Sequence, residues 1–406
     1  MSFRRVATVV ASVACWSAGA LQSQQTVAFI NANLVDPAHG ILTDQTVIAE
    51  GGKITYVGSE QRMPPEDATV IDLAGRYLAP GLVDAHVHIA DFASAHRALL
   101  SGVTTARNMG VSHFADVGLR ELARSGAIDA PEILAAGYHV RPEPADELFM
   151  DAPEMADLRD AVHGAEAMRR MVRLMVSRDV DFIKTNATER AGLPETDPRT
   201  PYYSVAELTA LVEEASQNGL PVAAHAHGDV GGRAAVLAGV RSIEHGTYLS
   251  EETLDLMVQR DTYLVPTIAV VADLTMPGGD YDNAVLNVRG RHMLPRVRGM
   301  AAAAHAKGVK IAAATDTGYG PESVLRLSHE LIELVNVGLS PLEAIRAATT
   351  VAAELLGMQD QVGQVALGFD ADLLVLDRNP LEEIGAFQDV LLVMNNGKVV
   401  VDRTAF

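Results

Sequence analysis

Cysteine is nearly absent from this sequence, because among 406 residues there is only one, Cys15. It lies in an N-terminal segment typical of a secretory signal peptide, with arginines at positions 4 and 5, an apolar run over residues 6–16 and small residues at 18–20. Cleavage after Ala20 would leave no cysteine, which excludes disulfides and thiolate metal ligands. We therefore expect residues 1–20 to be a signal peptide and the protein to be secreted or periplasmic. Lipidation of Cys15 stays open.

Positive charge is also scarce. Lys and Arg number 32 against 52 Asp and Glu, which gives a net charge of −20. This balance argues against nucleic acid or an anionic membrane surface as a partner. No segment beyond the N-terminal one is long and apolar enough to span a membrane, so we expect no stable membrane insertion. The composition suits an enzyme that acts on a small molecule.

Both ends of the chain are rich in short β-type runs. They lie at residues 27–30, 46–49 and 53–57, and again at 372–376, 390–394 and 398–401, with a hairpin turn signal at Asn395-Asn396-Gly397. These runs predict one small β-sandwich domain assembled from residues 21–78 and 359–406.

Between these ends, residues 79–358 alternate apolar strands with helical patterns such as 205–218 and 341–356. The sequence lacks the glycine-rich phosphate loop that an open doubly wound sheet would place after its first strand. We therefore predict the α/β class, with a TIM-like (β/α)8 barrel. The eight expected strands end near these residues: His88, Thr105, His139, Lys184, His225, His245, Pro266 and Asp316.

Polar side chains stand at several of these strand ends. His86 and His88 flank one valine, and residues i and i+2 of a strand point to the same face, so both imidazoles converge on one point. Two neutral imidazoles in this arrangement suit zinc or a similar divalent ion. Because the strand ends of a barrel share one rim, Lys184, His225, His245 and Asp316 should lie there as well.

This order of residues resembles the amidohydrolase superfamily over nearly the whole mature chain, and within it the Xaa-Pro dipeptidase (prolidase) branch that includes ochratoxin-hydrolysing enzymes. Imidazolonepropionase is a neighbour of that branch. The motifs that resemble the family are His86-Val87-His88, Ile183-Lys184, His225-Ala226-His227-Gly228, Ser242-Ile243-Glu244-His245-Gly246, Thr315-Asp316-Thr317 and Gly368-Phe369-Asp370-Ala371-Asp372-Leu373-Leu374-Val375.

The resemblance implies two divalent metal ions, with zinc as the expected metal. His86, His88 and Asp316 would hold one ion and His225 and His245 the other. Lys184 would lie between them as a carbamate formed with carbon dioxide, because a desolvated amine near cations has a lowered pKa and reacts in its neutral form. A salt bridge from Lys184 to Asp316 or another carboxylate is the alternative. Asp316 is the expected catalytic residue, which takes a proton from a metal-bridging hydroxide and delivers it to the leaving amine.

Three further residues are candidate substrate contacts. His227 lies two residues beyond His225 and could replace it as ligand if the strand register shifts by two. His139 ends the third expected strand, and Tyr203 lies in the loop after the fourth. Asp84 and Glu244 stand beside ligands, and we interpret them as supports of the rim.

The predicted function is hydrolysis of amide bonds in dipeptides or N-acyl amino acids by a binuclear metal centre. Opening of a cyclic amide, as in imidazolonepropionase, is the alternative. Arg141 and Arg190 are candidates to bind a substrate carboxylate. The expected partner is a small-molecule amide, and the resemblance implies a homo-oligomer.

Overall fold

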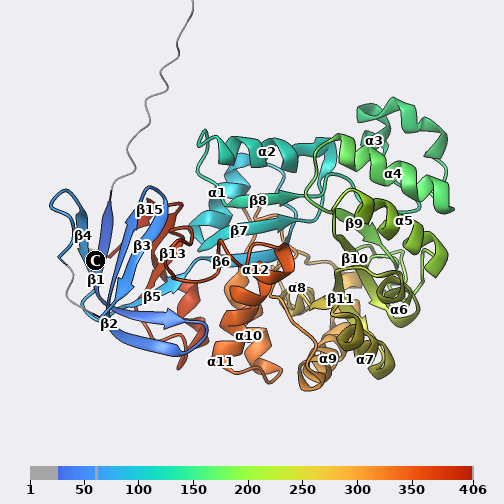
Figure 1. The fold of residues 1–406 in the computed structure, drawn as a ribbon. Coiled ribbons are helices and arrows are strands. Elements are labelled where there is room, and N and C mark those ends of the chain that lie inside the picture. Colours follow the sequence, from blue (N-terminus) through green and yellow to red (C-terminus); the bar gives the residue numbers. More distant parts are fainter. Residues whose placement is uncertain (1–25, 60–62, 405–406) are drawn as a thin grey trace, which may run out of the picture.

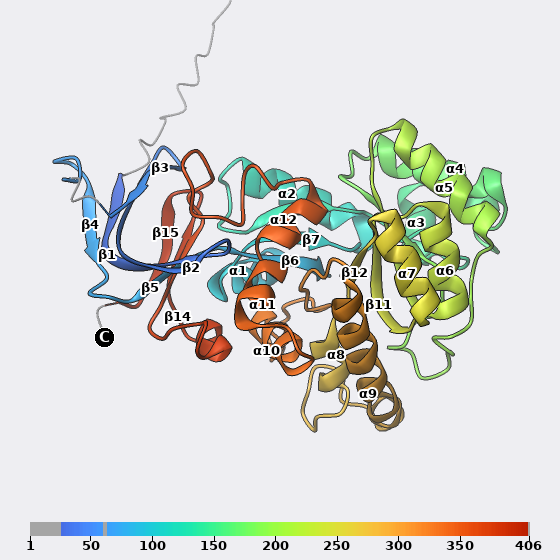
Figure 2. The ribbon, with the colours of Figure 1, turned by 60° about the horizontal axis from the view of Figure 1, so that its bottom comes forward.

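The computed structural model of this chain describes residues 26–59 and 63–404. The predicted signal peptide, with Cys15, lies outside the described residues, so it stays a prediction. Figures 1 and 2 show a β-rich region at one end of the molecule and a larger region of helices and parallel strands beside it.

Strands from both ends of the described chain form the β-rich region, here called the terminal sheet. Its order is β15-β14-β13-β5-β1-β2-β3, with β4 paired to β1. Antiparallel pairing of β13 with β5, in which Leu374 faces Ala79, joins the late strands to the early ones. The strands are β1 (Val27–Asp36), β2 (Gly40–Glu50), β3 (Lys53–Gly58), β4 (Thr69–Asp72), β5 (Tyr77–Pro80), β13 (Leu373–Leu376), β14 (Val390–Asn395) and β15 (Lys398–Asp402).

The six β-type runs predicted in the terminal regions lie in strands, except for Asp372, which directly precedes β13. The predicted hairpin joins β14 to β15, with Asn395 opposite Lys398. Its turn needs positive φ at both central residues, and Asn396 (φ 48°) and Gly397 (φ 76°) supply it. The topology is one connected eight-stranded sheet. The two packed layers of a sandwich stay a prediction, as do the domain boundaries.

Seven parallel strands build the larger region in two sheets, ordered β6-β7-β8 and β12-β11-β10-β9. Every residue of β6, β7, β9 and β10 is buried, as the near-continuous apolar runs predicted for strands covered on both faces. The strands are β6 (Leu82–Val87), β7 (Val103–Asn108), β8 (Glu132–Ala135), β9 (Ile183–Asn186), β10 (Val222–Gly228), β11 (Ser242–Tyr248) and β12 (Tyr263–Val265).

Isolated parallel bridges connect these sheets. Val140, in the segment after β8, pairs with Thr185 of β9. Leu264 of β12 pairs with Ile311, and Val87 of β6 pairs with Thr317. The segment 311–317 therefore contacts the outer strand of each sheet. The α/β class is confirmed, and closure into an eight-stranded barrel stays a prediction.

Two predicted strand ends are wrong. The third predicted barrel strand is β8, which ends at Ala135, four residues before His139. The eighth predicted strand, expected to end at Asp316, has bridges only at Ile311 and Thr317. In this segment the backbone N–H of Ala313 donates to the carbonyl of Ala347, outside any strand, which interrupts the ladder. A left-handed φ of 55° at Asp316 then turns the chain.

Helices pack around the parallel strands (Figures 1 and 2). Of the residues that the structure describes, no helix is both long and apolar enough to cross a membrane. The helices are α1 (Phe92–Leu100), α2 (Ala115–Arg124), α3 (Asp146–Asp151), α4 (Ala165–Ser177), α5 (Val205–Gln217), α6 (Asp229–Ala238), α7 (Glu251–Arg260), α8 (Ile268–Asp273), α9 (Ala284–Lys307), α10 (Leu327–Asn336), α11 (Pro341–Ala347) and α12 (Thr350–Leu356), with 3₁₀ turns η1 (Ser112–Phe114), η2 (Pro153–Leu158) and η3 (Ile384–Gln388).

The predicted helix over 205–218 is α5, which begins with a capping box formed by Ser204 and Glu207. The helix predicted over 341–356 is instead two helices, α11 and α12. They separate because the backbone carbonyls of Ala347 and Ala348 accept hydrogen bonds from Ala313 and Val83 of the parallel region, outside their own helix. Thr349 takes φ −136° and ψ −95° at the break.

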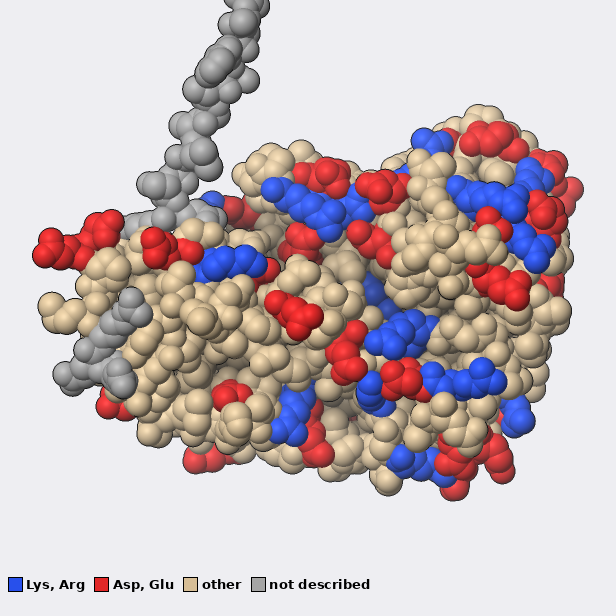
Figure 3. Space-filling model, in the orientation of Figure 1, with Lys and Arg blue, Asp and Glu red and all other residues tan. Residues whose placement is uncertain are grey.

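Figure 3 shows acidic and basic side chains interspersed over one face of the molecule. The terminal sheet side of this face has few basic side chains, and the helical side has both signs close together. Single-sign positive surface of the kind that nucleic acid binds is not visible on this face.

Candidate active site

Side chains from four parallel strands meet at a cavity of about 80 Å³. His86 comes from β6, Lys184 from β9, His225 and His227 from β10, and His245 from β11. Asn186 of β9 and Val270 and Val271 of α8 also line it. The remaining lining residues lie outside strands and helices: His88, His139, Arg190, Ala191, Gly192, Leu274, Tyr281 and Asp316. All six predicted metal ligands therefore lie at one cavity.

His86, His88 and Asp316 form one group whose donor atoms lie within 4.8 Å of one another. The Nε2 atoms of both histidines are 3.3 Å from Oδ1 of Asp316. Nδ1 of His86 is 2.9 Å from a carboxylate oxygen of Glu244, and Nδ1 of His88 is 2.9 Å from the carbonyl of Gly110. Both partners only accept, so each Nδ1 bears a hydrogen, and Nε2 is the ring nitrogen that faces Asp316.

His225, His227 and His245 form a second group with the same spacing. Nε2 of His225 donates to the carbonyl of Glu189 at 3.1 Å, which leaves the lone pair on Nδ1. Nδ1 of His227 and Nδ1 of His245 contact the hydroxyls of Thr247 and Thr267, at 2.9 and 2.8 Å. A hydroxyl both donates and accepts, so it does not fix the tautomer of these two rings.

Burial holds these imidazoles in their neutral form. It lowers the pKa of His225 and of His245 well below the usual value and lowers the pKa of His227 to about 3. The neutral ring is the form that binds a metal ion. Burial by itself would raise the pKa of Asp316, but His86 and His88 lower it well below its usual value, so this carboxylate is ionised.

Lys184 lies fully buried at the cavity, and its Nζ atom has no hydrogen-bond partner among the described residues. Burial lowers the pKa of this amine to about 8, against the opposing effect of Glu244 and Asp316. An unpartnered buried ammonium is costly, and none of the ion pairs within residues 26–59 and 63–404 includes Lys184. The predicted alternative, a salt bridge to Asp316 or another carboxylate, is therefore not formed within the described residues.

These residues fit a pair of metal ions. Each histidine group offers neutral nitrogens, Asp316 offers an ionised carboxylate, and the two groups contain no thiolate. Such nitrogen and oxygen donors suit zinc and similar divalent ions. Carboxylation would turn the orphaned amine of Lys184 into an anion with two further oxygen donors.

Glu244 contacts the first group through His86. It accepts from His86 and forms an ion pair with Arg107 at 3.0 Å, and all three side chains are buried. Burial by itself would raise the pKa of Glu244, but Arg107 and His86 lower it to about 2. Arg107 is itself fixed by hydrogen bonds to the carbonyl of Ala85 and to Ser242. The prediction that Glu244 supports the rim agrees with these contacts.

Asp84, the second predicted support, fixes the segment that bears Asp316. Its carboxylate accepts from the backbone and hydroxyl of Thr315, from the hydroxyl of Tyr319 and from the backbone N–H of His86. Burial raises the pKa of Asp84 to about 6 despite these hydrogen bonds. One carboxylate therefore connects His86 of β6 to the Asp316 segment.

Three residues at or beside the cavity have an unfavourable backbone conformation. His245 (φ 73°), Thr267 (φ 48°) and Asp316 (φ 55°) all adopt the left-handed region, which is unfavourable for residues other than glycine. His245 and Asp316 are predicted ligands, and Thr267 contacts the ring of His245. Their side-chain directions are thus fixed by conformations that the surrounding packing must stabilise.

The predicted substrate contacts have different positions. His139 lines the cavity, and its ring stacks on that of His88 with centroids 5.8 Å apart, although it does not end a strand. His227 also lines the cavity. Tyr203 does not: it is buried, its hydroxyl lacks a hydrogen-bond partner among the described residues, and its ring contacts His163. A contact between Tyr203 and the substrate therefore stays a prediction that the lining of this cavity does not support.

Tyr281 was missed by the sequence analysis. It lines the cavity, and its hydroxyl donates to the backbone carbonyl of Asp316 at 3.2 Å. The backbone of Tyr281 is held by Asp273, whose carboxylate accepts from the N–H of Tyr281. The sequence offers only a turn-rich segment around Gly278-Gly279 as a signal, which does not indicate the direction of the next side chain.

Residues 77–400 match the amidohydrolase family. The chain belongs to the amidohydrolase family. It is 29% identical to an ochratoxinase from Aspergillus niger over 421 residues, covering 92% of this chain and 86% of that protein. Imidazolonepropionase from Paracoccus denitrificans is 26% identical over 391 residues, covering 85% of this chain and 90% of the relative.

This amidohydrolase also resembles a Xaa-Pro dipeptidase whose crystal structure has methionine bound in the active site. The TM-score is 0.82 at 26% identity, and the likeness covers 93% of this chain and all of the other. The family membership and these relatives make the protein a hydrolase that acts on carbon–nitrogen bonds, which confirms the predicted reaction class.

Proposed function

We propose that this amidohydrolase holds two divalent metal ions, zinc being the expected metal, and hydrolyses the amide bond of a dipeptide or N-acyl amino acid. The observation that carries the proposal is the buried, unpartnered Nζ of Lys184 at the same cavity as the two histidine groups. His86, His88 and Asp316 would hold one ion through Nε2, Nε2 and a carboxylate oxygen. His225, through Nδ1, and His245 would hold the other.

Lys184 would join the two ions as a carbamate. Its neutral amine forms an N–C bond to carbon dioxide and releases one proton, which yields an anion with two oxygen donors. Bound ions would supply a water of lowered pKa and would polarise the scissile carbonyl. The protein contributes fixed ligands, since Glu244 and Gly110 set the ring orientation of His86 and His88.

Asp316 would transfer the proton of the reaction. Its carboxylate lies at the cavity and is held by its own backbone N–H, which donates to the carbonyl of His86. It takes a proton from the attacking water as the new C–O bond forms. It then delivers that proton to the leaving nitrogen as the C–N bond breaks, so that acid and amine are released.

The side chains of Arg141 and Arg190 support a substrate with a free carboxylate. Arg190 lines the active cavity, and both arginines line an adjoining cavity of about 190 Å³ that also includes His88 and His139. Neither forms an ion pair with a carboxylate in the described part of the chain. Burial and the neighbouring charge of Arg190 lower the pKa of Arg141. A bound carboxylate would neutralise this pair of like charges.

The test is product release from a panel of Xaa-Pro dipeptides, N-acyl amino acids and cyclic amides, with metal content measured beside it. Metal-replete wild type is compared with Lys184→Ala and Arg190→Ala. We expect turnover of linear amides that Lys184→Ala loses, and a raised KM in Arg190→Ala only for substrates with a free carboxylate. Turnover of cyclic amides alone would favour the ring-opening reaction instead. No turnover of any amide, or unchanged turnover in Lys184→Ala, would contradict the proposal.

Carboxylation has its own readout. Incubation with ¹³C-bicarbonate should give a carbamate ¹³C signal in the wild type that Lys184→Ala lacks. Absence of the signal in active, metal-replete enzyme would remove the carbamate from the proposal.

Three broader points are also proposed. Residues 79–358 form one (β/α)8 barrel, supported by the bridges that connect segment 311–317 to both parallel sheets, and residues 21–78 and 359–406 form the second domain. Export rests on the sequence of residues 1–20, and N-terminal sequencing of the protein from the culture supernatant or periplasm tests it. A homo-oligomer is expected by analogy with the family, and light scattering tests it.

A further inference from the structure

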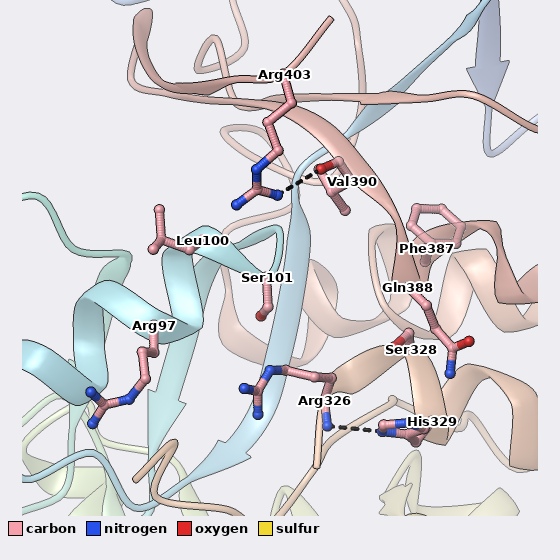
Figure 4. Close-up of a pocket in the computed structure, with 10 residues that line it drawn as sticks. All are labelled: Arg97, Leu100, Ser101, Arg326, Ser328, His329, Phe387, Gln388, Val390 and Arg403. Atoms are coloured by element: carbon pink, nitrogen blue, oxygen red, sulfur yellow. Dashed lines mark hydrogen bonds between the residues drawn. The ribbon is translucent and has the colours of Figure 1, made fainter. Parts of the chain in front are cut away.

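A second cavity, of about 470 Å³, lies at the junction between the parallel region and the terminal sheet. It is bordered by the end of α1, the start of α10 and the segment from η3 to β15. Figure 4 shows three arginines at its wall, with Arg403 above and Arg97 and Arg326 below. Arg97 belongs to α1, Arg326 directly precedes α10 and Arg403 directly follows β15. None of its lining residues belongs to the catalytic cavity.

The three guanidinium groups are not neutralised. None of them forms an ion pair with a carboxylate in residues 26–59 and 63–404, although the whole chain has a net charge of −20. Each is held by a backbone carbonyl: Nε of Arg97 donates to Tyr319 at 2.7 Å, Nη1 of Arg326 to Ser323 at 3.0 Å and Nη1 of Arg403 to Val390 at 3.1 Å. These bonds orient the guanidinium groups without cancelling their charge.

The other polar groups of the wall include further donors. Nδ1 of His329 accepts from the backbone N–H of Arg326 at 3.0 Å, so Nε2 bears the hydrogen. Gln388 and Ser101 add an amide and a hydroxyl, and no carboxylate lines the cavity. Guanidinium groups bind carboxylate and phosphate oxygens with paired N–H donors.

Apolar side chains complete the wall, since Leu100, Phe387 and Val390 also line it. The volume lies in the range of small-molecule sites. We propose that this cavity is a second binding site, which takes a small organic molecule with a phosphate or carboxylate group and an apolar body.

The cavity is connected to the catalytic segment through Tyr319. Arg97 donates to the carbonyl of this residue, and the guanidinium of Arg326 lies 5.8 Å from the centre of its ring. The hydroxyl of Tyr319 donates to Asp84, which also accepts from Thr315, directly before Asp316. An anion that draws Arg97 or Arg326 into the cavity therefore changes contacts that position the Asp316 segment. We expect occupancy to alter turnover.

Calorimetric titration of the metal-replete enzyme tests binding without any substrate. The probes are phenyl phosphate and benzoate, which distinguish the two anionic groups, and benzyl alcohol as a neutral analogue. We expect at least one anion to bind and the alcohol not to bind. Loss of one charged donor in Arg403→Ala should weaken binding about tenfold or more.

Arg260→Ala is the matched control, because Arg260 is an exposed arginine of α7 outside the cavity. It should leave the dissociation constant unchanged, and Arg403→Ala should keep its basal turnover. Unchanged affinity in Arg403→Ala would overturn the proposal, since an anion bound at the metals does not need Arg403. Equal weakening in Arg260→Ala, or no binding of either anion to the wild type, would overturn it too.

Hydrogen exchange of residues 315–320 tests the connection. Saturating phenyl phosphate or benzoate, whichever binds, should change exchange in this segment of the wild type but not of Arg326→Ala. Unchanged exchange in the saturated wild type would overturn the coupling to Asp316. Both readouts are independent of amide hydrolysis, so their failure differs from failure of the proposed function.

Discussion

The catalytic cavity and the junction beside the terminal sheet both contain buried or half-buried ionisable groups. The two regions differ in whether these groups have oppositely charged partners. At the catalytic cavity, Glu244 is buried between Arg107 and His86, and opposite charges lie within hydrogen-bond distance. At the junction, three arginines donate to backbone carbonyls, Arg97 also to the hydroxyl of Ser94, and none pairs with a carboxylate among the described residues. The carboxylate of the buried Asp372 accepts from the backbone N–H of Asn396 at 2.7 Å.

The pKa values reflect this difference. Arg107 and His86 hold the pKa of Glu244 at about 2 although it is buried, whereas burial raises the pKa of Asp372 to about 7. Compensated charge, as at Glu244, gives a group whose protonation state is constant near neutral pH. Lys184 and Asp84, which lack an opposite charge in hydrogen-bond contact, are the exceptions at or beside the catalytic cavity. Uncompensated charge gives groups that titrate or bind an ion. The following experiments test this contrast, from the largest expected effect to the smallest.

Asp316→Asn should have the largest effect. Asparagine retains an oxygen donor but cannot accept and return a proton, so we expect turnover to fall about 10²- to 10⁴-fold with both metals still bound. Steady-state kinetics with metal analysis on the same sample measures both. Wild-type turnover in a fully loaded variant would show that another group transfers the proton.

His225→Ala and His227→Ala form a matched pair on β10. Only His225 has its tautomer fixed by a carbonyl, that of Glu189, so we expect it to be the ligand. His225→Ala should lose metal from one position and lower turnover by more than about 100-fold, since removal of a mere supporting residue costs 10- to 100-fold. His227→Ala should keep two metals per chain. The opposite result would shift the register of the site by two residues.

Glu244→Gln should break the compensation at the catalytic cavity. We expect metal affinity and turnover to fall about 10- to 100-fold, because His86 loses its charged acceptor. The melting temperature should fall as well, since Arg107 becomes an unpaired buried charge.

The double variant Glu244→Gln with Arg107→Met separates these two effects. It should recover part of the melting temperature without recovering turnover. Recovery of both would mean that Glu244 serves only to neutralise Arg107.

Asp372→Asn should give the smallest effect, on stability alone. The unfolded carboxyl has a pKa of about 4, and the folded one about 7. The folded state therefore holds a proton that the unfolded chain releases, so stability falls as the pH rises between these values, by at most about 1.4 kcal/mol per pH unit. Asparagine removes this slope, and the melting temperature relative to wild type should rise from pH 4.5 to pH 7.5.

Asp360→Asn is the control for this experiment, because Asp360 is exposed. It should keep the pH dependence of the wild type. An unchanged slope in Asp372→Asn would show that the junction does not bury an uncompensated carboxyl.

Much of the fold follows from local pattern. The runs of β-branched and apolar residues predict the terminal strands and most parallel strands, and Asn395-Asn396-Gly397 predicts the hairpin. Sequence pattern failed where long-range hydrogen bonds decided the outcome. The segment before Asp316 lacks a continuous ladder, and the helix predicted over 341–356 is interrupted, because backbone groups of these two segments bond to each other and to Val83.

In the candidate site too, local pattern predicts some features and long-range contacts decide others. Strand periodicity and the order of strand ends are sufficient to bring His86, His88, Lys184, His225 and His245 to one cavity, because parallel strands end at the same edge. Local spacing cannot show the free nitrogen of each imidazole. The acceptors that set it, such as Gly110 for His88 and Glu189 for His225, come from other loops.

The sequence by itself determined the candidate ligand residues and their convergence on one cavity, since a two-residue strand period and a common strand direction are local properties. Only the tertiary structure decided that Lys184 is left without a partner, that Tyr203 packs away from the cavity and that Tyr281 contacts Asp316. It also brought together Arg97, Arg326 and Arg403, which are separated by up to several hundred residues in the chain. Such clusters depend on how distant elements pack, and no local pattern encodes that packing.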